Sequence, residues 1–138
     1  MKLVKELIQL NEDKQYPEEM SKELAKEGAD IAERLQDAGR RWDNTNSKQV
    51  DLHILRKKKK KFVKKGGPKI ADEIKKVDAE HAANSKEYDV SRKEADAFEK
   101  KNGFGVIYAW EAAHQKPWPY YKVWPGAGTK TGSKVKLV

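Results

Sequence analysis

Phe104-Gly105-Val106-Ile107-Tyr108-Ala109-Trp110 is the stretch that decides the fold class predicted for this chain. Large apolar residues take every second position, which is typical of a strand with one face in the core. The segment from Trp118 to Trp124 alternates again, but its prolines restrict it to an edge strand or an extended path. Val135 and Leu137 add a third short strand. The sequence therefore predicts a small aromatic-rich β meander over residues 103–138.

A helix over residues 108–116 is the competing interpretation, because Ala112 and Ala113 favour a helix. In the strand interpretation Phe104, Tyr108 and Trp110 share one face, which we assign to the core. The other tail aromatics have two possible roles. They fill the core, or they stack on bases while nearby lysines contact phosphates. The candidate binding residues of the tail are Trp118, Lys122 and Trp124, and at least one of the two tryptophans is expected to be exposed.

Helices are predicted upstream of this tail. Apolar spacing indicates a short amphipathic helix from Lys2 to Asn11 and a longer one from Pro17 to Trp42, which Asp43-Asn44-Thr45-Asn46 ends. Gly28 in the second helix allows close approach of another backbone. The predicted fold is α+β, with three to four helices followed by the β meander. Its segments are residues 1–46, 47–69, 70–102 and 103–138, packed as one compact unit.

The two middle segments are also read as helical. A helix from Lys48 to Lys65 stops at Gly66-Gly67-Pro68, although alternation at residues 50–54 leaves a strand start open. From Ile70 onward the pattern fits either one long helix or two consecutive helices. Lys100-Lys101 and Asn102-Gly103 mark the end of this segment, as basic residues and glycine do at a carboxyl end.

The run from Arg56 to Lys65 is the strongest functional signal. Residues 47–69 hold ten basic residues and one acidic residue, within a chain of net charge +8. Such a block calls for a polyanion or open solvent, and a phosphate backbone is the commonest polyanion. An anionic membrane surface, a solvated face and neutralisation by the acidic segments of the fold are the alternatives. The candidate binding residues are Arg56, Lys57, Lys58, Lys59, Lys60, Lys61, Lys64 and Lys65.

Composition excludes several classes of protein. The chain has no cysteine, so disulfides and cysteine-based zinc sites are excluded. No apolar run approaches the roughly 20 residues that span a bilayer, and the first ten residues do not resemble a secretory signal. We therefore expect an intracellular protein without a membrane span. No phosphate-binding glycine motif or nucleophile elbow is present, and no cofactor or metal is predicted.

The three histidines are weak signals of chemistry. His81 is expected to be a satisfied, half-buried side chain. His114 follows Glu111 at a spacing that places both on one helical face, and Lys116 is close in sequence. These three residues are the candidate catalytic set if the protein is a small basic metal-independent nuclease or toxin.

The first twelve residues, Met-Lys-Leu-Val-Lys-Glu-Leu-Ile-Gln-Leu-Asn-Glu, resemble the short amphipathic leaders of small virion and internal head proteins of tailed bacteriophages. The resemblance implies an accessory protein packed with DNA, in the host cytoplasm or inside a virion. Our preferred hypothesis is a non-enzymatic nucleic-acid-binding accessory or structural protein. The alternatives are the nuclease and a structural protein that docks on an acidic subunit or on virion subunits.

Overall fold

The computed structural model of the chain describes residues 16–59, 67–119 and 130–138. Its residues form two compact units. Unit 1 comprises Met1–Gln36 and Ser91–Val138, and unit 2 comprises Asp37–Val90. The amphipathic helix predicted from Lys2 to Asn11 lies outside the described residues.

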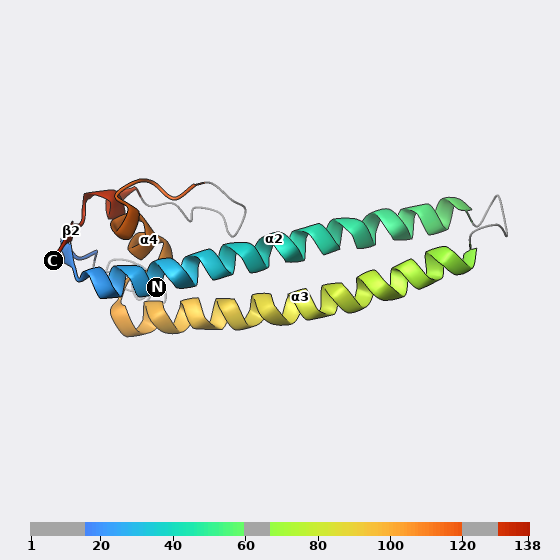
Figure 1. Cartoon of the computed structure of the whole chain (residues 1–138), viewed down its shortest axis with the longest axis horizontal. Helices are drawn as coiled ribbons and strands as arrows, with labels where there is room; N and C mark the ends of the chain where they lie inside the picture. The colour runs from blue at the N-terminus through green and yellow to red at the C-terminus, as the bar shows by residue number, and fades with distance from the viewer. Residues whose placement is uncertain (1–15, 60–66, 120–129) are drawn as a thin grey trace, which may run out of the picture. The chain divides into compact units, whose positions relative to one another are not determined.

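Three α-helices account for most of the described residues: α2 (Lys22–Lys59), α3 (Gly67–Asn102) and α4 (Val106–His114) (Figure 1). A 3-10 helix, η1 (Thr131–Lys134), and two short strands, β1 (Glu19–Met20) and β2 (Lys136–Leu137), complete the described elements. The predicted α+β fold is therefore wrong. Within residues 16–59, 67–119 and 130–138 the only sheet is the parallel pair of β1 with β2, and the fold is mostly helical.

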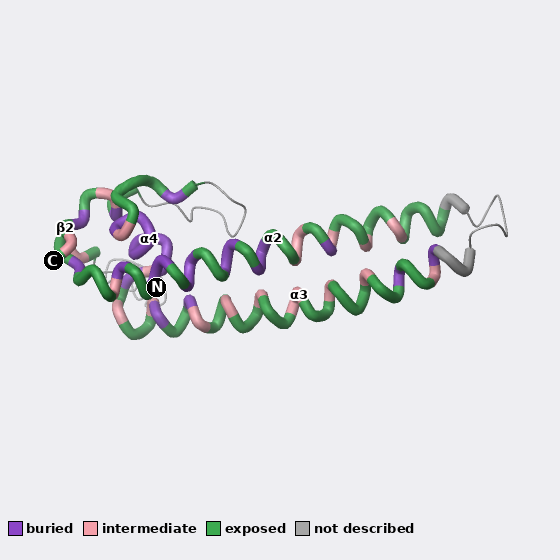
Figure 2. The backbone as a smooth tube through the Cα atoms, in the orientation of Figure 1, coloured by how far each residue is buried: buried purple, intermediate pink, exposed green. Residues whose placement is uncertain are grey.

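The β meander was predicted where the structure has α4. All residues from Val106 to Ala112 are buried, so α4 is enclosed on every side (Figure 2). A helix buried all round carries no polar face and therefore no helical period in its sequence. The alternation at Phe104–Trp110 is a chance pattern within a continuous apolar run. The competing interpretation, a helix supported by Ala112 and Ala113, is confirmed, and so is the burial of Phe104, Tyr108 and Trp110.

Unit 1 packs α4 against the first part of α2 and the last part of α3. Gly28 of α2 sits at the closest approach, because a Cβ atom there would lie 2.3 Å from Ala109 Cβ of α4 and 2.8 Å from the Phe98 ring of α3. The close approach predicted for Gly28 is thus confirmed. Phe104 joins the core edge-on to the rings of Phe98 and Tyr108.

The short sheet of unit 1 joins segments that are far apart in the sequence. Met20 of β1 pairs with Leu137 of β2, and Lys136 N–H donates to the Glu18 carbonyl at 2.9 Å. The strand predicted at Val135 and Leu137 is present in part, but its partner is β1 rather than the tail. The Tyr108 hydroxyl also donates to the Pro17 carbonyl at 2.7 Å. Together, the sheet and this bond hold residues 17–20 against the carboxyl-terminal segment.

Helix α2 begins and ends at other residues than predicted. Its first residue is Lys22 rather than Pro17, and the Ser21 hydroxyl accepts the Leu24 N–H at 3.1 Å as an N-cap does. The predicted stop at Asp43–Asn46 is wrong, because α2 continues to Lys59. The separate helices predicted before and after these residues are therefore one helix, and no strand starts at Val50.

Helix α3 settles the alternative left open for residues 70–101, since it is one continuous helix. It ends where predicted. Gly103 has a φ of +81° and donates its N–H to the Glu99 carbonyl at 2.8 Å, which is the left-handed carboxyl-terminal cap that glycine favours. Within unit 2, residues 37–59 of α2 and 67–90 of α3 lie side by side and run in opposite directions (Figure 1).

Removing the Tyr108 hydroxyl is expected to reduce the loss of folding stability that the protein shows at alkaline pH. Burial raises the pKa of Tyr108, with smaller contributions from Tyr16 and nearby carboxylates. Its folded-state pKa thus exceeds the unfolded value near 10, so its contribution to stability is complete below about pH 10 and is lost as the pH rises further. In urea unfolding from pH 7 to 11, Tyr108→Phe should lose less stability above pH 10 than the parent. Equal losses in the two proteins would contradict this assignment.

Candidate nucleic-acid interface

The two helices of unit 2 are held together by a polar seam, which fixes the position of the basic end. Trp42 Nε1 donates to Ser85 Oγ at 3.0 Å, and Gln49 Nε2 donates to Asp78 Oδ1 at 2.8 Å. The farther a residue lies along α2, the earlier its partner lies in α3, as an antiparallel hairpin requires. The carboxyl end of α2 and the amino end of α3 therefore lie together.

Thr45 is the centre of this seam and is 2% exposed. Its hydroxyl lies 3.0 Å from the Arg41 carbonyl and 2.7 Å from His81 Nδ1, and Asn84 Nδ2 donates to it at 3.3 Å. A threonine has one hydroxyl proton, so a bond to the carbonyl requires His81 to donate through Nδ1–H. The prediction of a satisfied, half-buried His81 is confirmed. This network also explains why residues 43–46 do not end α2, since the Thr45 hydroxyl finds partners in His81 and Asn84 of α3.

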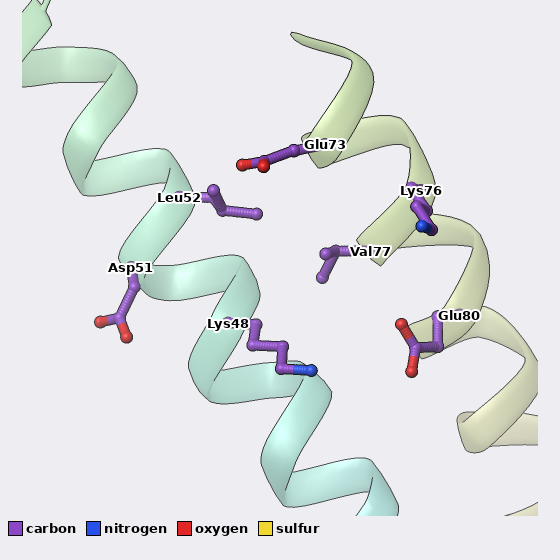
Figure 3. A pocket seen from close by; sticks show the side chains of 7 residues that line it. All are labelled: Lys48, Asp51, Leu52, Glu73, Lys76, Val77 and Glu80. Atoms are coloured by element: carbon purple, nitrogen blue, oxygen red, sulfur yellow. The ribbon is translucent and has the colours of Figure 1, made fainter. Parts of the chain in front are cut away.

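A groove opens between the helices closer to the basic end, with a volume of about 450 Å³ (Figure 3). Leu52 and Val77 point toward each other across its floor, and Lys48 extends from α2 toward α3. Its rim carries both signs of charge, from Lys48, Asp51, Glu73, Lys76 and Glu80. The groove therefore has no single charge preference, unlike the segment that follows it along α2.

The predicted binding residues begin at the last turns of α2. Arg56 and Lys57 are exposed, and neither forms an ion pair with a described residue. Lys58 and Lys59 continue the helix. Lys60, Lys61, Lys64 and Lys65 lie outside the described residues, in the segment between α2 and α3. The hairpin thus brings the described part of the run to one end of unit 2.

The candidate residues of the tail belong to unit 1. Trp118 is 7% exposed and its ring packs edge-on against Trp110, with the ring centres 4.9 Å apart. It is a core residue in this position and is not offered to a base. Lys122 and Trp124 lie outside the described residues. Of the predicted binding residues that the structure describes, Arg56 to Lys59 thus lie in the last turns of α2, and Trp118 lies in the core of unit 1.

The alternative catalytic set is divided among different partners. The His114 ring stacks on Trp110 at 4.1 Å, and its Nε2 lies 3.9 Å from the exposed carboxylate of Glu33. Lys116 Nζ lies 5.7 Å from the centre of the Trp110 ring, a cation–π contact. Glu111 is fully buried and accepts backbone N–H groups instead. The described contacts do not assemble Glu111, His114 and Lys116 into one acid–base site.

Glu111 has a structural role that was not predicted from the sequence. Its Oε2 accepts the N–H of Trp118 at 3.1 Å and the N–H of Lys130 at 2.9 Å. One buried carboxylate therefore binds both ends of the segment between residues 118 and 130. A signal was present in the sequence, since Glu111 is the one acidic residue among residues 102–138. A lone acid in a basic, aromatic segment needs a local partner when it is buried.

Searches for other kinds of site and for relatives give the following results. In the described part of the chain, no group of three or more metal-ligating side chains could hold a metal ion. None of the described helices is both long and apolar enough to cross a membrane. Comparison with protein families, with curated proteins and with solved structures finds no match to this chain.

Proposed function

We propose that the protein binds nucleic acid through the basic end of the unit 2 hairpin, as a non-enzymatic accessory or structural protein. The supporting observation is that α2 runs without a break into the lysine run and presents Arg56 and Lys57 exposed and without ion pairs to described residues. Cations held in this way remain available to neutralise phosphates and to release the counterions condensed on them.

Neutralisation within the fold is the main competing explanation of the run. Two ion pairs of arginine lie elsewhere: Arg34 pairs with Glu94 in unit 1, and Arg41 pairs with Glu87 in unit 2. Asp72 and Glu73, early in α3, are exposed and form no ion pair with Arg56 or Lys57. The charge at this end of unit 2 is therefore not cancelled by the contacts of the described residues.

The geometry favours binding without sequence recognition. Successive residues of an α-helix point in directions about 100° apart, so consecutive cations surround the axis of α2 rather than forming one face. Base recognition requires side chains aligned along one groove-facing surface. Cations on all sides of a helix instead contact phosphates, which are the same at every base sequence. The resemblance of residues 1–12 to phage leaders fits such a role, in which DNA of any sequence is bound inside a virion or in the host cytoplasm.

Affinity for nucleic acid is expected to fall steeply with salt. If about five to eight phosphates are contacted, log K should fall with log salt at a slope of roughly −4 to −7 for duplex DNA. Replacing residues Lys57 to Lys61 by glutamine should reduce this slope by roughly four to five. Fluorescence anisotropy with labelled duplex DNA, single-stranded DNA and RNA, over a salt series from about 50 to about 300 mM, measures the effect.

The matched control removes the same charge from another surface. Glutamine at the exposed Lys75, Lys76, Lys86, Lys93 and Lys100 of α3 also lowers the net charge by five, and should change the slope much less. Equal losses in both variants would show that net charge alone acts and would remove the assignment to the hairpin end. Binding to heparin but to no nucleic acid would assign the site to another polyanion, and cleavage of the probes abolished by His114→Ala would favour a nuclease.

A further inference from the structure

Helix α2 carries an uncovered apolar pair on the side that faces away from α3. Gln49 and Leu52 face α3, through the bond to Asp78 and the floor of the groove. Val50 and Ile54 lie two residues before and two residues after Leu52, which places them on the opposite side of the helix. They are 50% and 48% exposed. We call this side the outer face of α2, made by Asp43, Ser47, Val50, Ile54 and Lys57 at alternating spacings of four and three residues.

Unit 2 buries little apolar surface of its own, which makes an uncovered apolar pair more significant. Among its described residues, the buried hydrophobic ones are Ala38, Ile70 and Ile74, and the middle of its seam is the polar network of Thr45. A pair of helices alone buries only the residues along the line where the two helices meet. Stable helical domains pack further elements against such a pair. The outer face of α2 is positioned to receive that layer.

The charges at the two ends of the outer face determine what fits it. From the apolar pair, the face leads to Ser47 and Asp43 in one direction and to Lys57 and the lysine run in the other. A parallel copy would place two lysine runs side by side, which like-charge repulsion opposes. An antiparallel copy brings Lys57 of one face across from Ser47 of the other, one helical turn from Asp43. It also sets Val50 of each copy against Ile54 of the other, so the face is complementary to itself.

We propose that the outer face of α2 binds the same face of a second copy of this chain, antiparallel, to give a two-fold dimer in which unit 2 hairpins pack face to face. The antiparallel arrangement directs the two lysine-rich ends in opposite directions. The dimer does not depend on the proposed nucleic-acid binding. If both hold, one dimer carries two binding ends and bridges two nucleic-acid segments.

Sedimentation equilibrium of the full chain without nucleic acid, from about 1 to about 200 μM, tests the association. We expect a dimer in this range, with a dissociation constant raised at least roughly tenfold by the double variant Val50→Lys and Ile54→Lys. Both residues are half exposed, so the change should leave the helical circular dichroism intact. The matched control is Val90→Lys on α3, where valine is 64% exposed but not on the outer face, and the dimer should be unaffected.

Cysteine cross-linking tests the direction of the two helices, since the chain has no cysteine of its own. Val50→Cys and Ile54→Cys chains are mixed and oxidised. The antiparallel dimer should give mainly the mixed product, in which position 50 of one chain is joined to position 54 of the other. A parallel dimer would instead give the two symmetric products, each joining identical chains.

Three outcomes would each overturn the proposal. They are a monomer at the highest concentration, a dimer unaffected by the double lysine variant, and mainly symmetric cross-linked products. A monomer whose DNA affinity changes in the double variant would assign the face to nucleic acid instead.

Discussion

Gly28→Ala is expected to destabilise unit 1 strongly, although alanine is the better helix former. Alanine is favoured over glycine in a helix by about 1 kcal/mol. Against this, the new methyl group would lie 2.3 Å from Ala109 Cβ and 2.8 Å from the Phe98 ring, so α2, α3 and α4 would have to separate. Overpacking of this kind typically costs ~1–3 kcal/mol or more, and here the obstacle is a buried helix rather than a flexible side chain.

Gly39 in the same helix supplies the matched control. A Cβ there would lie 3.5 Å from the Tyr88 ring, an ordinary contact. Gly39→Ala should therefore raise the melting temperature by a few degrees through helix propensity, whereas Gly28→Ala should lower it by roughly 5 °C or more. Near-ultraviolet circular dichroism during heating measures both. Changes of the same sign in the two variants would contradict the close approach at Gly28.

Glu111→Ala is expected to cost unit 1 about 3–5 kcal/mol. Its carboxylate is fully buried and accepts the N–H groups of Trp118 and Lys130. Hydrogen bonds to a charged group contribute roughly 1.5–3 kcal/mol each, and the alanine variant leaves both donors without this acceptor. The desolvation cost of a buried carboxylate is recovered in the variant, but the donors remain buried, so the net change is still a loss.

Two further variants separate the hydrogen bonds from the charge. Glu111→Gln retains one acceptor oxygen and places an NH₂ group near the second donor. Its free energy of unfolding should therefore lie between those of the parent and the alanine variant. Glu94→Ala removes a carboxylate from the exposed ion pair with Arg34 and should cost less than about 1 kcal/mol. Urea unfolding measures all three. A Glu111→Ala loss as small as that of Glu94→Ala would show that the two backbone bonds contribute little.

Helices were predictable from this sequence, but their ends depended on the fold. The cap at Gly103 is local chemistry, so the end of α3 was found correctly. The four polar residues at 43–46 are a local signal for the end of a helix. Tertiary contacts override this signal, because Thr45 bonds to His81 and Asn84 of the other helix. Nothing in the sequence near Thr45 reports partners so far along the chain.

The tail was mispredicted for a different reason. Periodicity distinguishes a strand from a helix only when one face is polar, and Val106–Ala112 has no polar face. Glu111, the one charged residue within it, is buried with the rest. The candidate binding residues were easier to identify from the sequence than the fold was. A run of cations needs no tertiary contact to be recognised, whereas the outer face of α2 became visible only when Gln49 and Leu52 were seen to face α3.

The division of the chain also determines the order in which the protein can form during synthesis. Unit 2 is one continuous stretch, so its hairpin can close as soon as residue 90 has left the ribosome. Unit 1 cannot be completed then, because β1 pairs with β2 near the end of the chain, and α4 follows both long helices. Early α2 therefore waits for partners that are translated after unit 2, such as Phe98 and Ala109, which lie against Gly28. During that interval the apolar residues of early α2 are exposed to chaperones and to aggregation.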